Sequence, residues 1–132
     1  MNVHNLPIWS RTVVRAVRWI CTAQTGSEAA VHDPRWPRIE AALLALRSSG
    51  RHAVRIVDAD CGTGTLLLHA MGHARRLGFT AVEGHGIDRS SLLIGRARLA
   101  ARRAADPALG VDFEVADIVA ALRTSRTCRP IS

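Results

Sequence analysis

Residues 56–68 read IVDADCGTGTLLL, and the predicted fold depends on this stretch. It runs from a short apolar strand, through an acidic strand end and a glycine-bearing tight loop, into an apolar helix. Small loop residues let the backbone come close to a ligand, and the first turn of a helix offers free N–H groups. The stretch therefore predicts a site for a nucleotide-like ligand where the first strand ends.

Strands and helices alternate downstream of this stretch. Strands are predicted over residues 54–57, 79–87 and 111–115, and helices over residues 63–77, 91–105 and 118–122. This order implies parallel strands joined by right-handed crossovers. The predicted fold class is therefore α/β, with a partial parallel sheet of about three strands and helices on its faces.

The first 50 residues read as an N-terminal helical extension. An apolar stripe opposite an arginine stripe predicts a helix over residues 7–23, and a helix packed on its own domain is favoured over an interfacial membrane helix. Residues 25–28 read as a loop. Asp33-Pro34 then marks the start of a second helix, which ends before Gly50.

Residues 51–122 read as an incomplete ligand-binding core, and residues 123–132 read as a disordered tail because they contain no apolar run. A complete doubly wound sheet has further strands beside its first strand, and none is predicted here. Two explanations stay open: a truncated relative of a longer protein, which the abrupt change after Leu122 favours, or a small half-fold. Either way, strand 54–57 keeps an open edge, so we expect self-association through it or poor solubility.

Composition narrows the class of protein. A chain of 132 residues with 48% apolar residues is expected to form one domain with a core. Cys21, Cys61 and Cys128 form neither a disulfide framework nor a CxxC metal pattern, which favours a reducing cytoplasm. Arginines interrupt the N-terminal apolar stretch, so neither a signal peptide nor a membrane span is predicted.

The net charge of +7 comes from 18 basic residues, all of them arginine. Such a charge attracts anions, and a basic nucleic-acid-associated protein is therefore one hypothesis. The arginines are, however, spread along the chain, and no segment interleaves them with aromatic residues as a base-stacking surface does. Specific nucleic-acid binding is the less favoured interpretation.

Residues 55–118 resemble class I S-adenosylmethionine-dependent methyltransferases, which have a Rossmann-like fold. The first motif of that family is a strand, an acidic residue and a Gly-x-Gly-x-Gly loop. Asp58 matches the acidic residue, Gly62 and Gly64 match the second and third glycines, and Asp60 replaces the first. The resemblance implies that the loop, including Cys61, contacts the cofactor. The Asp60 carboxylate would either bind the amino group of the methionine moiety or repel its carboxylate.

Two further motifs of the family have counterparts in this chain. Asp88, followed by Arg89, ends the second strand, and the resemblance implies that its carboxylate accepts hydrogen bonds from the ribose hydroxyls. Asp117 ends the third strand and would contact the adenine amino group, while Ile118 would supply a backbone N–H or an apolar wall. The implied cofactor is S-adenosylmethionine, and the implied activity is methyl transfer to an unknown acceptor.

A dinucleotide is the competing ligand, and it needs a Gly-x-Gly-x-x-Gly loop. Leu67 stands where the third glycine of that pattern would be, and its bulk opposes the approach of a pyrophosphate. The motifs therefore favour the methyl donor, which carries no phosphate. No catalytic residue is assigned, because the family's acceptor contacts come largely from the region after a fourth strand. A catalytically inactive cofactor-binding or interaction module is the alternative.

Four side chains raise alternative chemistries. His69 and His73 share a helix face, but a metal site needs a third ligand, so no metal is predicted. Cys61 at a helix N-terminus could act as a nucleophile. A small side chain that simply fits the loop is favoured, since no base partner is evident. His85 precedes a strand end and could border a pocket, although a loop histidine is favoured.

Overall fold

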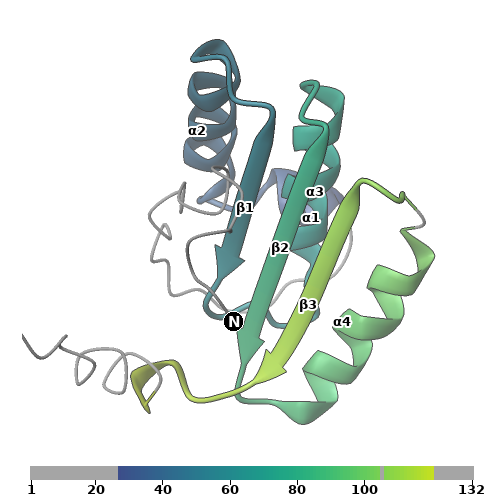
Figure 1. Ribbon diagram of the computed structural model, residues 1–132. Helices are drawn as coiled ribbons and strands as arrows, with labels where there is room; N and C mark the ends of the chain where they lie inside the picture. Colours follow the sequence, from purple (N-terminus) through teal and green to yellow (C-terminus); the bar gives the residue numbers. More distant parts are fainter. Residues whose placement is uncertain (1–26, 105, 121–132) are drawn as a thin grey trace, which may run out of the picture.

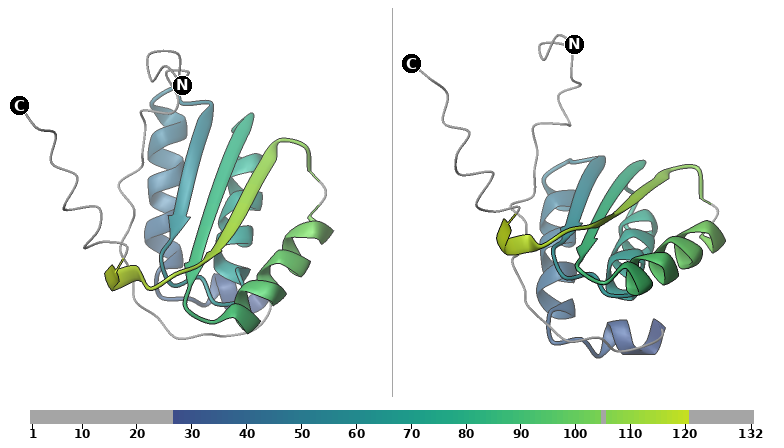
Figure 2. Two further views of the ribbon diagram at one scale, coloured as in Figure 1. Left: turned by 60° about the horizontal axis from the view of Figure 1, so that its bottom comes forward. Right: turned by 90° about the horizontal axis from the view of Figure 1, so that it is seen from below.

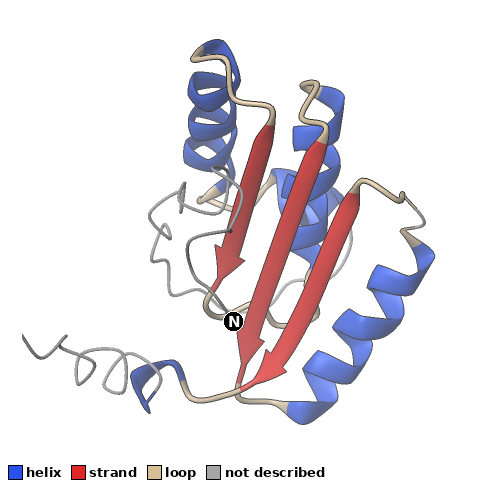
Figure 3. Ribbon diagram, viewed as in Figure 1, coloured by secondary structure: helices blue, strands red, loops and turns tan. Residues whose placement is uncertain are grey.

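The computed structural model describes residues 27–104 and 106–120 (Figure 1). Its elements are α1 Ser27–Val31, α2 Trp36–Ser48, β1 Ala53–Asp58, α3 Thr65–Arg76, β2 Ala81–Asp88, α4 Ser91–Arg103 and β3 Leu109–Val115. From β1 onward, strands and helices alternate along the chain (Figure 3), which confirms the predicted α/β class. The helix predicted over residues 7–23 and the tail predicted over residues 123–132 lie outside the described residues.

The three strands form one parallel sheet in the order β1-β2-β3. In its register, Val54 of β1 lies beside Val82 of β2, and Val82 lies beside Leu109 of β3. Because the strands are parallel, their carboxyl ends lie at the same edge of the sheet (Figure 1). Asp58 and Asp88 are the last residues of β1 and β2, so the topology brings these two positions to the same edge.

The described helices lie on one side of the sheet (Figure 2). Val82, Gly84 and Gly86 face them and are buried, and the largest fully buried side chains are Phe79, Leu67, Met71, Ile94 and Val82. Small residues on β2 let the layers approach closely: a Cβ at Gly86 would lie 2.6 Å from the ring of Phe113. The predicted arrangement of a three-stranded parallel sheet with flanking helices is therefore confirmed, and in the described part of the chain these helices share one face.

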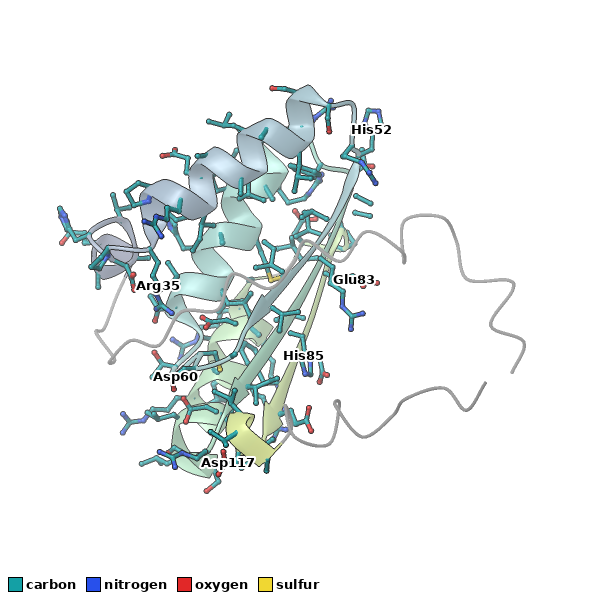
Figure 4. All side chains as sticks on the ribbon, turned by 90° about the vertical axis from the view of Figure 1, so that its left-hand side faces the viewer. Arg35, His52, Asp60, Glu83, His85 and Asp117 are labelled. Atoms are coloured by element: carbon teal, nitrogen blue, oxygen red, sulfur yellow. The ribbon has the colours of Figure 1, made fainter. Side chains whose placement is uncertain are left out.

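No described helix covers the other face of the sheet, which we call the bare face, and this face carries charged side chains from all three strands. They are Arg55, Glu83, His85, Asp112 and Glu114. His85 lies between two carboxylates, with Nδ1 3.1 Å from Asp112 and Nε2 3.2 Å from Glu114. Figure 4 shows Glu83 and His85 directed away from the helices. Alternation of apolar and charged residues along β2 and β3 accounts for this one-sided burial.

Several boundaries differ from the predicted ones by one or two residues, and two of the differences affect the packing. The loop predicted over residues 25–28 is wrong at its end, because α1 begins at Ser27. Burial of Ala30 against Trp36 and Leu66 stabilises this short helix. Phe79 precedes β2 instead of opening it, and it is fully buried in the core. No helix within the described ranges is long and apolar enough to cross a membrane.

Replacing Gly86 with alanine is expected to destabilise the fold by about 1–3 kcal/mol, because the new Cβ would overlap the buried Phe113 ring and the Cys61 sulfur. Urea-induced unfolding measures the change. Gly95→Ala is the matched control, since a Cβ there meets open space and the residue lies inside α4. It should gain about 0.5–1 kcal/mol. Equal stability of the two variants would contradict the proposed packing role of Gly86.

Among the described strands β1 is an edge strand, and this leads to a second prediction. His52 accepts hydrogen bonds from residues at the start of β2, so even-numbered residues of β1 face β2 and the backbone of Val57 faces outward. We predict that the chain associates in a concentration-dependent way, measured by light scattering. Val57→Pro should weaken this association, because it removes an outward N–H group.

Leu92→Ser is the control for that experiment, because Leu92 is 65% exposed on α4, far from β1 in sequence. It should leave association through the β1 edge unchanged. A chain that stays monomeric at high concentration would count against the edge as an association site.

Candidate functional site

A cavity of about 460 Å³ lies at the carboxyl ends of β1 and β2. The loop after β1, the residues after β2, and α1 with the segment that follows it form its wall. Its lining includes the predicted site residues Asp60, Cys61, Gly62, Asp88 and Arg89. Figure 4 shows Arg35 and Asp60 on the helix side of the sheet. The structure thus brings together residues from the two strand ends that the sequence singled out.

Two glycines shape the loop after β1. Gly62 has a φ of 55° and Gly64 a φ of 76°, the left-handed region that favours glycine. Gly64 also opens α3, and a Cβ there would lie 2.9 Å from the Phe113 ring. Its role is therefore to let the helix start close to the core, and it does not line the cavity. No non-glycine residue in the described ranges has a positive φ, so Asp60 replaces the expected first glycine without a left-handed backbone.

The Asp88 carboxylate connects the loop after β1 to the end of β2 through hydrogen bonds. Its Oδ2 accepts a hydrogen bond from the Gly62 N–H at 3.0 Å, and its Oδ1 accepts one from the Ser90 N–H at 2.8 Å. The Cys61 N–H adds a bond to the Ile87 carbonyl oxygen at 3.0 Å. Asp88 is 7% exposed. Each carboxylate oxygen keeps a second lone pair, so the group can still accept a hydrogen bond from a ligand.

Asp60 lies in the cavity wall beside Asp88. Burial raises the pKa of Asp60, and a hydrogen bond with Asp88 and the Asp88 charge raise it further, while Arg35 and Arg89 act in the opposite direction. Two adjacent carboxyl groups resist being ionised together. A ligand with a positive charge would relieve this repulsion, and an anionic ligand would add to it.

Arg35, which the motifs did not reveal, joins the segment before α2 to the end of β1. Its guanidinium makes two hydrogen bonds to Asp33, at 3.0 Å and 2.8 Å, and lies 3.7 Å from the Asp58 carboxylate. The bond to Arg35 holds the pKa of Asp33 below its ordinary value. Arg35 and Asp33 line the cavity, and Arg35 is 9% exposed. No local pattern signals this contact, since Arg35 and Asp58 are far apart in sequence.

Asp58 is not among the cavity-lining residues and lies beneath the loop. Burial raises its pKa, and the charge of Arg35 lowers it by a smaller amount. Asp58 Oδ1 accepts a long hydrogen bond of 3.4 Å from the Asp60 N–H. Asp58 Oδ2 is buried and has no hydrogen-bond partner among the described residues. The end of β1 therefore holds an unused acceptor directly below the glycine loop.

Cys61 lies in the loop with its side chain buried against Gly86 and exposed by only 7%. Burial and the charges of Asp58 and Asp88 raise the pKa of the Cys61 thiol to about 12. The thiol therefore stays protonated at neutral pH and is a poor nucleophile. This geometry supports the interpretation that a small side chain simply fits the loop.

The third strand end does not reach the cavity. Asp117 and Ile118 are not among its lining residues. Asp117 Oδ1 instead accepts a hydrogen bond from the Val119 N–H at 2.9 Å, which stabilises the turn after β3. Ser90 does line the cavity, and its side chain accepts a hydrogen bond from the Leu93 N–H, so it also caps α4.

The histidines show no metal-binding arrangement. No cluster in the described part of the chain groups enough histidine, cysteine or acidic side chains to hold a metal ion. His69 and His73 pack edge-on against the ring of Trp36, with centroid distances of 4.4 Å and 5.1 Å. His85 lies within β2 on the bare face of the sheet, so the favoured interpretation as a loop histidine is wrong, and His85 does not line this cavity either.

Comparison of the chain with protein-family models, with curated proteins and with solved structures gave no match.

Replacing Asp58 with asparagine is expected to raise the melting temperature at neutral pH. The pKa of Asp58 is raised in the folded protein, so its favourable contribution is present below the ordinary value of 3.8 and is lost as the pH rises through the folded value. At a pH above the folded pKa of Asp58, the buried negative charge of its carboxylate lowers the stability of the fold. Asparagine removes this charge and keeps a hydrogen-bond acceptor. Thermal unfolding between pH 3 and pH 7, followed by circular dichroism, should show a gain that shrinks as the pH falls.

Glu28→Gln is the control, because Glu28 is exposed on α1. It should shift the melting temperature little at any pH. A lower melting temperature of the Asp58 variant at pH 7 would mean that attraction to Arg35 outweighs the cost of burial.

Proposed function

We propose that this chain binds S-adenosylmethionine in the cavity at the ends of β1 and β2, as a methyltransferase-like protein. The observation that carries the proposal is the hydrogen bond that connects the loop after β1 to the last residue of β2. A loop with two left-handed glycines follows β1, and its Gly62 N–H is bonded to the Asp88 carboxylate that ends β2. Parallel α/β sheets bind ligands outside the carboxyl ends of their strands. The cavity volume of about 460 Å³ lies in the range of small-molecule sites.

The charges of the wall support a cationic ligand. S-adenosylmethionine carries a sulfonium and an ammonium against one carboxylate, so its net charge is positive. Asp60 and Asp88 stand side by side in the wall, while Arg35 is paired with Asp33. We infer that Asp60 binds the ammonium or faces the sulfonium, and that Asp88 accepts hydrogen bonds from the ribose hydroxyls. Arg89 is also in the wall, and we assign it to the ligand carboxylate.

The resemblance assigns the adenine amino group to Asp117. Asp117 lies outside the cavity lining and is bonded to the following turn. The adenine ring is therefore assigned to the apolar part of the wall, near Ala30, Leu66 and Leu93.

A dinucleotide fits this site less well. Leu67 is 1% exposed and belongs to the core beneath the sheet, so its side chain fills the space that a third glycine would leave for a pyrophosphate. The adjacent carboxylates of Asp60 and Asp88 would also repel phosphate groups. Both observations favour a ligand without phosphates.

Methyl transfer itself depends on holding an acceptor against the sulfonium. The acidic wall residues Asp60 and Asp88 could orient the cofactor, and Asp60, whose pKa is raised, could accept a proton from the acceptor. Binding without turnover is the competing function. The bare face favours an additional role for this chain in contacts with other molecules, since the helices of residues 27–104 and 106–120 cover the sheet on one side.

Isothermal titration calorimetry with S-adenosylmethionine and S-adenosylhomocysteine tests the proposal. The first ligand should bind about tenfold more tightly, because it carries the additional positive charge beside Asp60. Asp60→Asn should remove most of this preference while the second ligand keeps its affinity. Asp88→Ala should abolish binding of both ligands, because the carboxylate also positions the Gly62 and Ser90 N–H groups.

Asp112→Asn is the matched control, since this carboxylate is exposed on the bare face and away from the cavity. It should bind both ligands as the parent chain does. No detectable heat with either ligand at millimolar concentration would overturn the proposal. Equal affinity for both ligands, unchanged by Asp60→Asn, would overturn the role of Asp60 alone.

A further inference from the structure

A second hollow lies along the edge of the sheet that β3 forms, between β3 and α4. Its volume is about 520 Å³, and residues of the last two turns of α4 and of the first part of β3 line it. Figure 1 shows α4 running beside the edge of β3 that faces away from β2. Ala101, Leu109 and Phe113 form its apolar floor, and Arg98 and Arg102 stand on the helix side. We call this hollow the β3–α4 groove.

The backbone of β3 presents hydrogen-bonding groups to this groove. The Ala108 carbonyl oxygen and the Ala116 N–H bond to β2, so the even-numbered residues of β3 face β2 and the odd-numbered ones face outward. Two outward groups are already used: the Leu109 N–H bonds to Asp106, and the Phe113 carbonyl oxygen accepts from Arg98 at 2.9 Å. Between them, within residues 27–104 and 106–120, the N–H and the carbonyl oxygen of Val111 have no partner.

The groove is positively charged. Arg98 uses one nitrogen for the Phe113 carbonyl oxygen, and its other N–H groups have no bond to the described residues. Arg102 has no ion pair or hydrogen bond within the described part of the chain and is exposed. The acidic residue at the rim, Asp112, points to the bare face, where it is 3.1 Å from His85. Within the described residues neither Arg98 nor Arg102 forms an ion pair, and Asp112, the acidic residue of the lining, is engaged with His85.

We propose that the β3–α4 groove binds an extended acidic peptide segment of another protein as an additional strand of the sheet. Main-chain bonds to an exposed edge supply affinity in this mode, and side chains at alternate positions supply specificity. Alternate side chains of the added strand point toward α4, where glutamate or aspartate meets Arg98 and Arg102. The other side chains point toward the charged bare face of the sheet.

A peptide fits this groove better than a nucleic acid does. Base stacking needs exposed aromatic rings, and Phe113, the aromatic residue in the lining, is 4% exposed. The carbonyl oxygen and the N–H of Val111 are spaced to pair with the backbone of an added strand. The floor of the groove is apolar. This site is separate from the cavity at the ends of β1 and β2, and the proposal does not depend on the ligand bound there.

Fluorescence anisotropy of a labelled peptide of alternating valine and glutamate tests the proposal. The peptide should bind, while the same peptide with lysine in place of glutamate should not. Arg102→Glu should weaken binding at least about tenfold, because it reverses a charge in the groove. Arg103→Glu, a neighbouring exposed arginine outside the lining, should retain most of the affinity.

Backbone pairing is tested on the peptide, so that the protein fold is left unchanged. In an added strand, alternate backbone N–H groups face β3 and the others face away from it. Methylation of the first set of nitrogens blocks strand addition, and methylation of the second set leaves the bonds to β3 intact. We expect the first methylated peptide to lose binding and the second to keep it. Equal binding of both, or equal loss in the Arg102 and Arg103 variants, would overturn the proposal.

Two further outcomes would also overturn it. Tighter binding of single-stranded DNA than of the acidic peptide, abolished by Arg102→Glu, would mean that the groove takes a nucleic acid. A loss of self-association on Arg102→Glu, with no peptide binding by the parent chain, would mean that a second copy occupies the groove.

Discussion

One carboxylate connects the fold to the candidate site. Asp88 ends β2, and its two oxygens accept N–H groups from the loop after β1 and from the residue that caps α4. The glycine loop, the central strand and the following helix are therefore fixed at a single point. Since the group is 7% exposed and already engaged, a ligand that uses it shares it with the backbone. A movement of the glycine loop would consequently change how strongly the Asp88 carboxylate can accept a hydrogen bond from a ligand.

The segment before the sheet contributes to the same site. α1 and the residues that follow it line the cavity, and Arg35 joins them to β1 through its pairing with Asp33 and its closeness to Asp58. This arginine offsets part of the acidic charge that gathers at the strand ends. The cavity thus combines acidic strand ends with one buried cation placed by an element that is distant in sequence. Its charge balance depends on the docking of that short helix, which rests mainly on the burial of Ala30.

The strands and helices could be predicted because their signals are local. Alternation in Val111–Val115, the Ser90 cap and the glycines at positions 62 and 64 each act within a few residues. The residues grouped around Asp60 and Asp88 could also be predicted, because parallel topology brings strand ends together. The Arg35 contact could not be predicted, since it joins segments with no shared pattern. Asp117 was placed at the ligand by analogy, whereas its carboxylate bonds to the next turn.

The bare face of the sheet has a thermodynamic consequence. Unfolding a protein raises the heat capacity in proportion to the apolar surface that becomes exposed, and exposure of polar surface lowers it. Here the strands bury apolar side chains under one helix layer, and the other face already presents Arg55, Glu83 and Asp112 to solvent. The heat-capacity change per residue should therefore be smaller than for a sheet covered on both faces. For the described part of the chain we therefore expect a flatter stability curve, with a weaker dependence on temperature around its maximum.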